Sequence, residues 1–151
     1  MNARSGSEPT LLYVMKQVEL AVRARLDEMF RPIGMTALQY TALTVLEHRA
    51  GLSTAQLARS SFVTAQTMAD MVGALEQRGL IERYRDAGDR RRLVVDLTAK
   101  GHDLLDRYRA EVAALEEQML SGLTPGQAAE LRHSLAVCRA NLSRHPRQRP
   151  G

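Results

Sequence analysis

The stretch from Ser53 to residue 78 constrains the fold more than any other, because it reads as two short helices separated by a turn. Ser53 followed three residues later by Gln56 is the pattern of a capping box, in which each side chain binds a backbone N–H of the other residue. A helix is therefore expected to begin there, and serines at 60 and 61 end it. Thr64 is then a suitable N-cap for a second helix that runs to about residue 78.

The second of these helices has two very different faces. Its apolar residues recur at three- and four-residue spacing and predict one buried face: Met68, Met71, Val72 and Leu75. The opposite face carries only small or uncharged side chains: Ala65, Gln66, Ala69, Gly73, Ala74 and Gln77. A solvated helix face is normally rich in Lys and Glu, so this bare face predicts close approach to another surface. The major groove of DNA is wide enough to admit a helix.

A basic β-hairpin is predicted directly after the second helix. Gly79 occupies the usual place of a C-cap glycine. Two strand-like runs, residues 80–85 and 93–97, flank a turn-rich stretch with Gly88 near its tip. Between residues 78 and 92 the chain has six arginines, at 78, 83, 85, 90, 91 and 92, and three acids, Glu82, Asp86 and Asp89. The hairpin therefore presents a local excess of positive charge.

The order of these elements resembles the winged helix-turn-helix of the MarR family of bacterial transcriptional regulators. The family's wing pattern is present as Asp89-Arg90-Arg91, followed by the run from Val95 to Gly101, Val-Asp-Leu-Thr-Ala-Lys-Gly. The resemblance extends from about Thr10 to Leu142. It implies a mainly α fold with a small β wing (α+β), in which a winged helix-turn-helix at about 36–98 is flanked by dimerisation helices at about 10–30 and 99–142.

Three residues at the start of the second helix, Thr64, Gln66 and Thr67, are candidates for contact with DNA bases or phosphates. Hydroxyl and amide groups reach base edges, and the free N–H groups of a helix start receive a phosphate. The alternative is a packed helix with an unremarkable outer face. Asp70 requires explanation if this helix enters the groove, because a carboxylate there would repel phosphate. It either accepts a hydrogen bond from a cytosine amino group or points aside.

In the hairpin, the resemblance implies that Asp89 holds Arg91 by a charge-assisted pair while an arginine enters the minor groove of DNA. Arg91 is the first candidate for that arginine, with Arg90 next and Arg92 in the same run. Arg83 and Arg85 are expected to neutralise phosphates. The alternative is a solvated, charged loop, which is what most charge runs are.

The terminal segments carry more apolar surface than a small winged helix can bury. Amphipathic helices are predicted from Thr10 to Phe30, from Ala99 to about Leu120, and from the Thr124-Pro125-Gly126-Gln127 start to Leu142. Residues 1–9 are predicted to be a mobile arm, and residues 143–151 a disordered basic tail. A second copy of the chain would cover the stripes, and the resemblance implies a two-fold homodimer that reads a pseudo-palindromic operator.

Composition favours a cytoplasmic binding protein over an enzyme. The 151-residue chain has a net charge of +4 and no apolar run long enough for a membrane span. Its single cysteine, Cys138, is predicted to be buried and inert on an apolar helical stripe. The four histidines, His48, His102, His133 and His145, show no metal-ligand spacing, so neither a metal nor another cofactor is expected. No phosphate loop or nucleophile motif is present.

We therefore expect a sequence-specific DNA-binding regulator, a repressor released by a small apolar or phenolic effector. In the family, such effectors bind where the dimer helices meet the winged module. Met15, Tyr40 and Tyr108 are candidates to line that cleft, although each taken singly reads equally well as a core residue. The alternative function is a protein-interaction or adaptor module that keeps the winged fold without specific DNA readout.

Overall fold

The computed structural model describes residues 7–143. The predicted arm (1–9) and tail (143–151) therefore fall largely outside the described residues, as does His145. The chain divides into two compact units, one ending at Arg109 and the other beginning at Ala110. Each unit is described on its own below.

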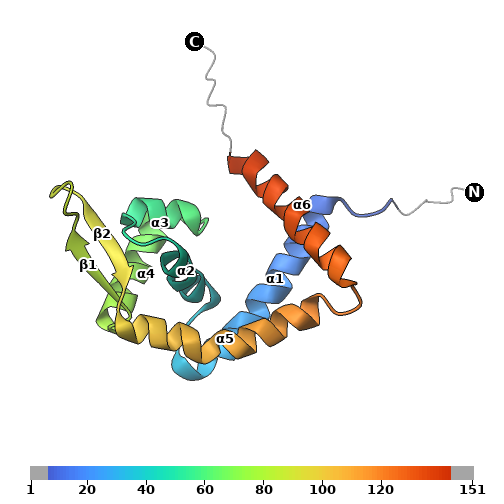
Figure 1. Ribbon diagram of the computed structural model, residues 1–151, viewed down its shortest axis with the longest axis horizontal. Coiled ribbons are helices and arrows are strands. Elements are labelled where there is room, and N and C mark those ends of the chain that lie inside the picture. The colour runs from blue at the N-terminus through green and yellow to red at the C-terminus, as the bar shows by residue number, and fades with distance from the viewer. Residues whose placement is uncertain (1–6, 144–151) are drawn as a thin grey trace, which may run out of the picture. The chain divides into compact units, whose positions relative to one another are not determined.

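The described chain is mainly helical and contains one small sheet (Figure 1), which confirms the predicted fold class. Its elements are, in order, α1 (Leu11–Phe30), the 3-10 helix η1 (Arg31–Ile33), α2 (Ala37–His48), α3 (Thr54–Ser60), α4 (Ala65–Gln77), β1 (Ile81–Arg85), β2 (Leu93–Leu97), α5 (Ala99–Met119) and α6 (Pro125–Ser143).

Side-chain caps fix where the helices begin. Thr10 and Thr64 cap α1 and α4, with the Thr64 hydroxyl accepting from the backbone N–H of Thr67. Complete capping boxes open α2, through Thr36 and Gln39, and α3, through Ser53 and Gln56. Because a cap satisfies N–H groups that have no partner inside the helix, these residues set the helix boundaries locally. The predicted starts of all four helices are confirmed.

The hairpin is antiparallel, and its register pairs Ile81 with Leu97 at the base and Arg85 with Leu93 near the turn. Gly79 joins it to α4 with a φ of 71°, the left-handed conformation that glycine adopts without strain. The middle of β2 is also joined to the segment ahead of α3, because the N–H of Val95 donates to the carbonyl of Leu52 at 2.8 Å.

The core of the first unit lies beneath α4. The apolar face of α4 predicted from the sequence is buried there. Its neighbours in the core come from α1, α2, α3 and the hairpin, and the largest of them are Phe30, Leu43, Leu57, Leu80, Ile81 and Val95. Three aromatic rings add to this core, since Phe30 stacks on Tyr40 at 4.6 Å between centroids and meets Tyr108 edge-on at 4.9 Å. Burial of one face fixes which face of α4 remains outside.

The two terminal helices leave their apolar side chains exposed. Helix α6 has no buried residue, and α1 buries only Phe30. Large apolar side chains are exposed on α1 at Leu11, Leu12, Val14, Met15 and Val18, and on α6 at Leu131, Leu135, Val137 and Leu142. Cys138 is also exposed, so the prediction that it is buried is wrong. The apolar side chains of α6 are not buried by any other part of the chain that the structure describes.

Gly101, at the end of the wing pattern, has the tightest surroundings of the described glycines. A Cβ built at Gly101 would lie 2.2 Å from the carbonyl oxygen of Leu80 and 3.2 Å from a methyl carbon of Leu97. Cβ atoms in real proteins essentially never lie within 3.0 Å of another heavy atom. The Leu80 carbonyl is also held in place, because it accepts from the N–H of Thr98 at 3.1 Å. Only glycine therefore lets the first turn of α5 pack against the start of the hairpin.

We expect Gly101→Ala to lower the free energy of unfolding by about 3 kcal/mol, because the backbone on both sides must move. The matched control is Gly73→Ala in α4, where the added methyl meets nothing within 4 Å. That control should raise stability by up to about 1 kcal/mol, through helix propensity. Urea denaturation measures both, and equal stability of the two variants would contradict the close packing assigned to Gly101.

Candidate nucleic-acid interface

The start of α4 is exposed and ordered by its own side chains. The Thr64 hydroxyl accepts from the N–H of Thr67 at 3.1 Å and lies 3.0 Å from the Thr67 hydroxyl oxygen. Both threonines and Gln66 between them are exposed. The free N–H groups of this first turn carry the positive end of the helix dipole. The three polar residues predicted to contact DNA thus form one exposed cluster around a site suited to an anion.

Asp70 accepts a hydrogen bond from a neighbour on its own helix. The side-chain amide of Gln66 donates to the Asp70 carboxylate at 3.3 Å. This contact turns the Gln66 nitrogen toward Asp70 and leaves the Gln66 carbonyl oxygen free to accept a hydrogen bond. The carboxylate therefore orients a candidate base-reading side chain.

The outer face of α4 is as bare as the sequence predicts. Ala65, Ala69 and Gln77 are exposed, while Gly73 and Ala74 are partly covered. Because four of its six residues are alanine or glycine, the backbone on this face can come closer to a facing surface than that of an ordinary solvated helix.

The turn of the hairpin is held by two aspartates through backbone groups. The Asp89 carboxylate accepts from the backbone N–H of Arg91 at 3.0 Å, and Asp86 accepts from Gly88 N–H at 3.2 Å. The pairing of Asp89 with Arg91 thus acts on the Arg91 main chain, where the resemblance implied an ion pair with its side chain. Arg90 and Arg91 are both exposed on this ordered turn.

Arg92 points away from its two neighbours and back to the helix-turn-helix. Its guanidinium donates to the side-chain carbonyl of Gln56 and lies 3.6 Å from the carboxylate of Asp86. The same Gln56 oxygen accepts from Ser53 N–H at 3.0 Å as part of the capping box. Arg92 therefore ties the hairpin to the start of α3. Sequence reasoning missed this contact, because the two residues are 36 positions apart.

Arg83 and Arg85 also have partners within the first unit. Arg83 makes a two-pronged ion pair with Glu76 of α4, at 2.9 and 3.0 Å. This hydrogen bonding holds the pKa of Glu76 below its usual value. Arg85 donates to the backbone carbonyl of Arg90 at 2.9 Å, across the turn. Both arginines remain exposed, so each can lie beside a phosphate while it braces the hairpin.

A single carboxylate fixes the base of the hairpin. Asp96 accepts from Gly51 N–H at 2.5 Å through one oxygen and from the Tyr84 hydroxyl through the other. The hydrogen bond to Asp96 raises the pKa of Tyr84, so that the phenol keeps its proton above its usual range. Asp96 thus joins both strands to the loop between α2 and α3. The hairpin and the helix-turn-helix are therefore one rigid module.

The three residues predicted to line an effector cleft do not lie together. Tyr40 and Tyr108 both contact the Phe30 ring, whereas Met15 is exposed and lies fifteen residues earlier on α1, about 22 Å along the helix axis. A cavity of about 640 Å3 opens elsewhere in the first unit, and none of the three residues lines it. Its lining combines the apolar Met35, Leu38 and Met71 with polar and charged residues, among them Arg23, Asp27, Arg31 and Thr67.

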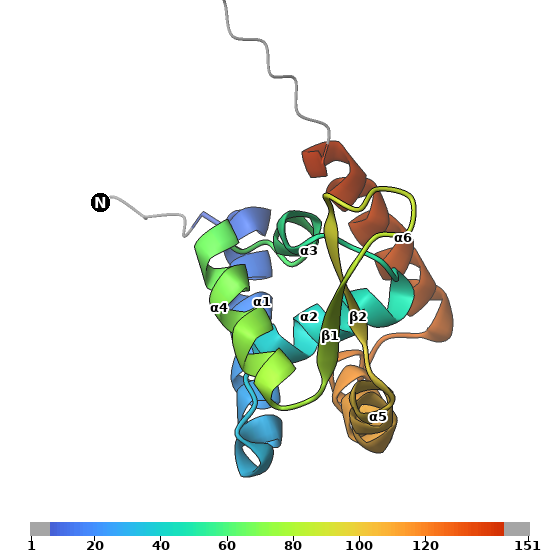
Figure 2. The same cartoon turned by 90° about the vertical axis from the view of Figure 1, so that its left-hand side faces the viewer.

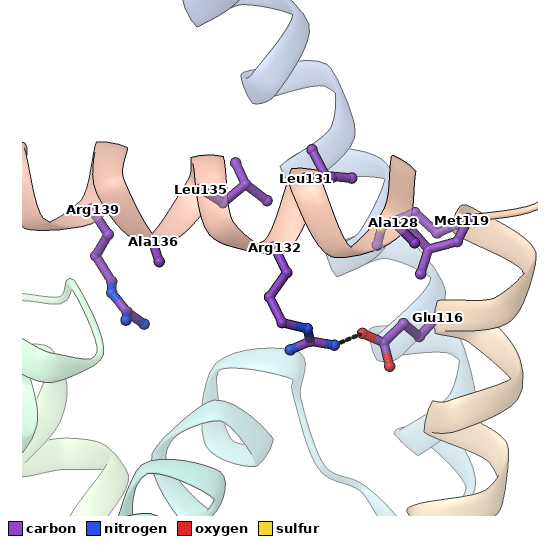
Figure 3. A pocket seen from close by; sticks show the side chains of 9 residues that line it. Glu116, Met119, Ala128, Leu131, Arg132, Leu135, Ala136 and Arg139 are labelled. Atoms are coloured by element: carbon purple, nitrogen blue, oxygen red, sulfur yellow. Dashed lines mark hydrogen bonds and ion pairs between the residues drawn. The ribbon is translucent and has the colours of Figure 1, made fainter. Parts of the chain in front are cut away.

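The second unit contains a groove between α5 and α6 (Figure 3), with a volume of about 490 Å3. Leu131 and Leu135 of α6 and Met119 of α5 line it, and an ion pair of Arg132 with Glu116 crosses it at 3.4 Å. Within residues 7–143 no group of His, Cys, Asp and Glu side chains could hold a metal ion. None of the helices described is long and apolar enough to span a membrane.

Figure 2 shows the start of α4 and the tip of the hairpin at the same end of the first unit. Two helices joined by a tight turn, followed by an antiparallel hairpin braced against them, define a winged helix-turn-helix.

Comparison with known proteins agrees with this class. A model of the MarR family matches residues 33–92. The HTH-type transcriptional repressor Rv2887 of Mycobacterium tuberculosis is 32% identical over 130 residues, covering 86% of this chain and 94% of the repressor. The chain belongs to the MarR family of transcriptional regulators.

Solved structures repeat the fold over nearly the whole chain. The transcriptional regulator PA3341 has a TM-score of 0.80 at 29% identity, covering 89% of this chain and 98% of that one. The MepR–DNA complex of S. aureus has a TM-score of 0.75 at 24% identity, with 89% and 99% covered. At 24% identity, the similarity to MepR shows only that the two chains share a fold.

The contact of Arg92 with Gln56 predicts an energetic coupling between the hairpin and α3. We expect Arg92→Ala and Gln56→Ala to couple by about 0.5 to 1 kcal/mol in a double-mutant cycle on unfolding, because each removes the same partly exposed hydrogen bond. Gln39, the capping-box residue of α2, is the matched control. Arg92→Ala with Gln39→Ala should be additive, and coupling of the same size in both cycles would contradict the contact.

Proposed function

We propose that the chain is a sequence-specific repressor that binds duplex DNA as a homodimer, with α4 in the major groove and the hairpin over the adjacent minor groove. One observation carries this proposal. The bare face and exposed polar start of α4 lie at the same end of a rigid module as the arginine-bearing turn. The repressor name of the mycobacterial relative supports it.

Within this arrangement, the start of α4 reads bases. Gln66 has its carbonyl oxygen free to accept from adenine N6 or cytosine N4, since its nitrogen is turned to Asp70. Thr64 and Thr67 lie where a helix start meets a phosphate or a base edge. Arg83 and Arg85, on the first strand, face phosphates beside the groove.

The arginines of the turn divide their roles. Arg91, with its main chain held by Asp89, is the side chain proposed to enter the minor groove, and Arg90 lies beside it. Arg92 serves the interface by holding the hairpin at a fixed angle to α3. The run of three arginines therefore provides two residues for DNA and one for the position of the wing.

The homodimer is supported by the large apolar side chains that α1 and α6 each leave exposed, because such side chains are normally covered by a partner when several occur on one helix. A two-fold pair would place two copies of α4 about one turn of DNA apart, roughly 34 Å, and so select a pseudo-palindromic operator. Because the proposed ligand is chromosomal DNA, we propose that the protein acts in the cytoplasm, by binding and without catalysis.

A small apolar or phenolic effector is part of the proposal. The cavity of about 640 Å3 in the first unit suits such a molecule, because apolar side chains and two arginines line it. Because Thr67 and Met71 line this cavity, a ligand there would touch α4 itself and favour a setting of the helix that fits DNA less well. Tyr40 and Tyr108, which both contact Phe30, remain candidates for a second contact region, whereas Met15 lies outside that cluster.

We expect Arg91→Ala to weaken operator binding by about 1 to 3 kcal/mol and to lower the slope of log K against log salt by about one. Fluorescence anisotropy in a salt series measures both quantities, on DNA footprinted upstream of the protein's own gene. Arg107→Ala on α5 removes the same charge outside the interface and should leave binding unchanged. Absence of any duplex binding at low salt would favour the adaptor function.

Gln66→Ala is expected to relax sequence preference while leaving non-specific binding nearly intact. Removing one base-reading side chain should cost about 1 to 3 kcal/mol of discrimination against operator variants at a single base pair. Competition with a panel of single-substitution operators checks this expectation. An equal loss on operator and random duplex would mean that Gln66 only positions the DNA backbone.

A further inference from the structure

The turn between α3 and α4 reverses the usual placement of polar and apolar side chains. Ser61 is buried, with 6% of its surface exposed, and among the described residues its hydroxyl has no hydrogen-bond partner. The next residue, Phe62, is 82% exposed. Burying the serine hydroxyl costs free energy of desolvation, and exposing the phenylalanine ring loses the stabilisation that its burial would bring.

Phe62 also has a backbone conformation that is unfavourable for its side chain. Its φ of 57° makes it the only non-glycine residue with positive φ in the described part of the chain. Gly or Asn adopts this left-handed conformation more readily, whereas a bulky residue there is an outlier. The turn itself is held by backbone hydrogen bonds, from Ser61 N–H to Leu57 and from Val63 N–H to Ala58. The turn therefore requires the conformation but not the aromatic ring.

The place of Phe62 in the chain indicates which part of the DNA its ring would meet. It lies two residues before Thr64, the N-cap of α4, and so its Cα lies within about 7 Å of the Thr64 Cα. The major groove is only about 12 Å wide. When the start of α4 enters the groove, a residue this close to it reaches the wall of the groove, which consists of deoxyribose and phosphate.

We propose that Phe62 packs its ring against deoxyribose on the wall of the major groove and so positions α4 on duplex DNA. This inference rests on the proposed function. The neighbouring side chains that face DNA are polar or charged, and they engage phosphates and base edges. An uncharged ring instead loses its exposed surface against the apolar face of a sugar. It adds affinity that depends on neither the base sequence nor the release of counterions.

The test compares Phe62→Gly with Phe62→Leu. Glycine removes the ring and the backbone penalty, so Phe62→Gly should melt at the same temperature as the wild-type protein or higher. Its affinity for both operator and random duplex should nevertheless fall about tenfold, with the slope of log K against log salt unchanged. Leucine keeps an apolar side chain and the same unfavourable backbone, and Phe62→Leu should retain most of the affinity.

Other results would overturn the inference. Unchanged DNA affinity in Phe62→Gly, or a melting temperature that falls together with affinity, would make the ring dispensable or purely structural. A weaker dimer in sedimentation would assign Phe62 to contact with the second copy, and a loss confined to the operator would assign it to base reading.

Arg91→Ala separates failure of the Phe62 proposal from failure of the proposed DNA-binding function. If wild-type protein binds duplex DNA and loses affinity on Arg91→Ala, failure at Phe62 leaves the proposed function standing.

Discussion

Burial of Met68, Val72 and Leu75 fixes the rotation of α4 about its axis, and the rest of the interface depends on that setting. Each of these side chains is fully removed from water, and a turn of the helix that exposed them would lose several kcal/mol. The opposite face is consequently determined by the core. A helix held this firmly loses little conformational entropy when it meets a partner, so the surface it presents is already in its binding geometry.

The wing depends on the same core through four short connections. These are the Leu52–Val95 bridge, the Asp96 carboxylate, the Arg92–Gln56 contact and the Arg83–Glu76 ion pair, and each joins the hairpin to the helix-turn-helix. Rotation of the hairpin alone would break at least one of them. Displacement of the module therefore moves α4 and the arginine-bearing turn together.

Much of this fold could be predicted from the sequence because its determinants are local. Capping boxes, the glycine after α4 and the strand-turn-strand pattern act within a few residues of one another, and the structure confirms them. The partners of the arginines could not be predicted. Glu76 accepts from Arg83 and Gln56 from Arg92 because tertiary packing brings their elements together, and a charge count contains no such information. Met15 was grouped with Tyr40 and Tyr108 because of the family resemblance, whereas the two tyrosines meet at Phe30 and Met15 lies fifteen residues before Phe30 on α1.

The exposed apolar face of α6 links the stability of this regulator to its abundance. A helix with no buried residue in its own chain gains its folding free energy from association, which follows mass action. At low copy number the terminal helices would be the first to fray, and dilution alone would remove the spacing on which paired half-sites depend. A cell could thus set the sharpness of repression through the rate of synthesis, before any small molecule is present.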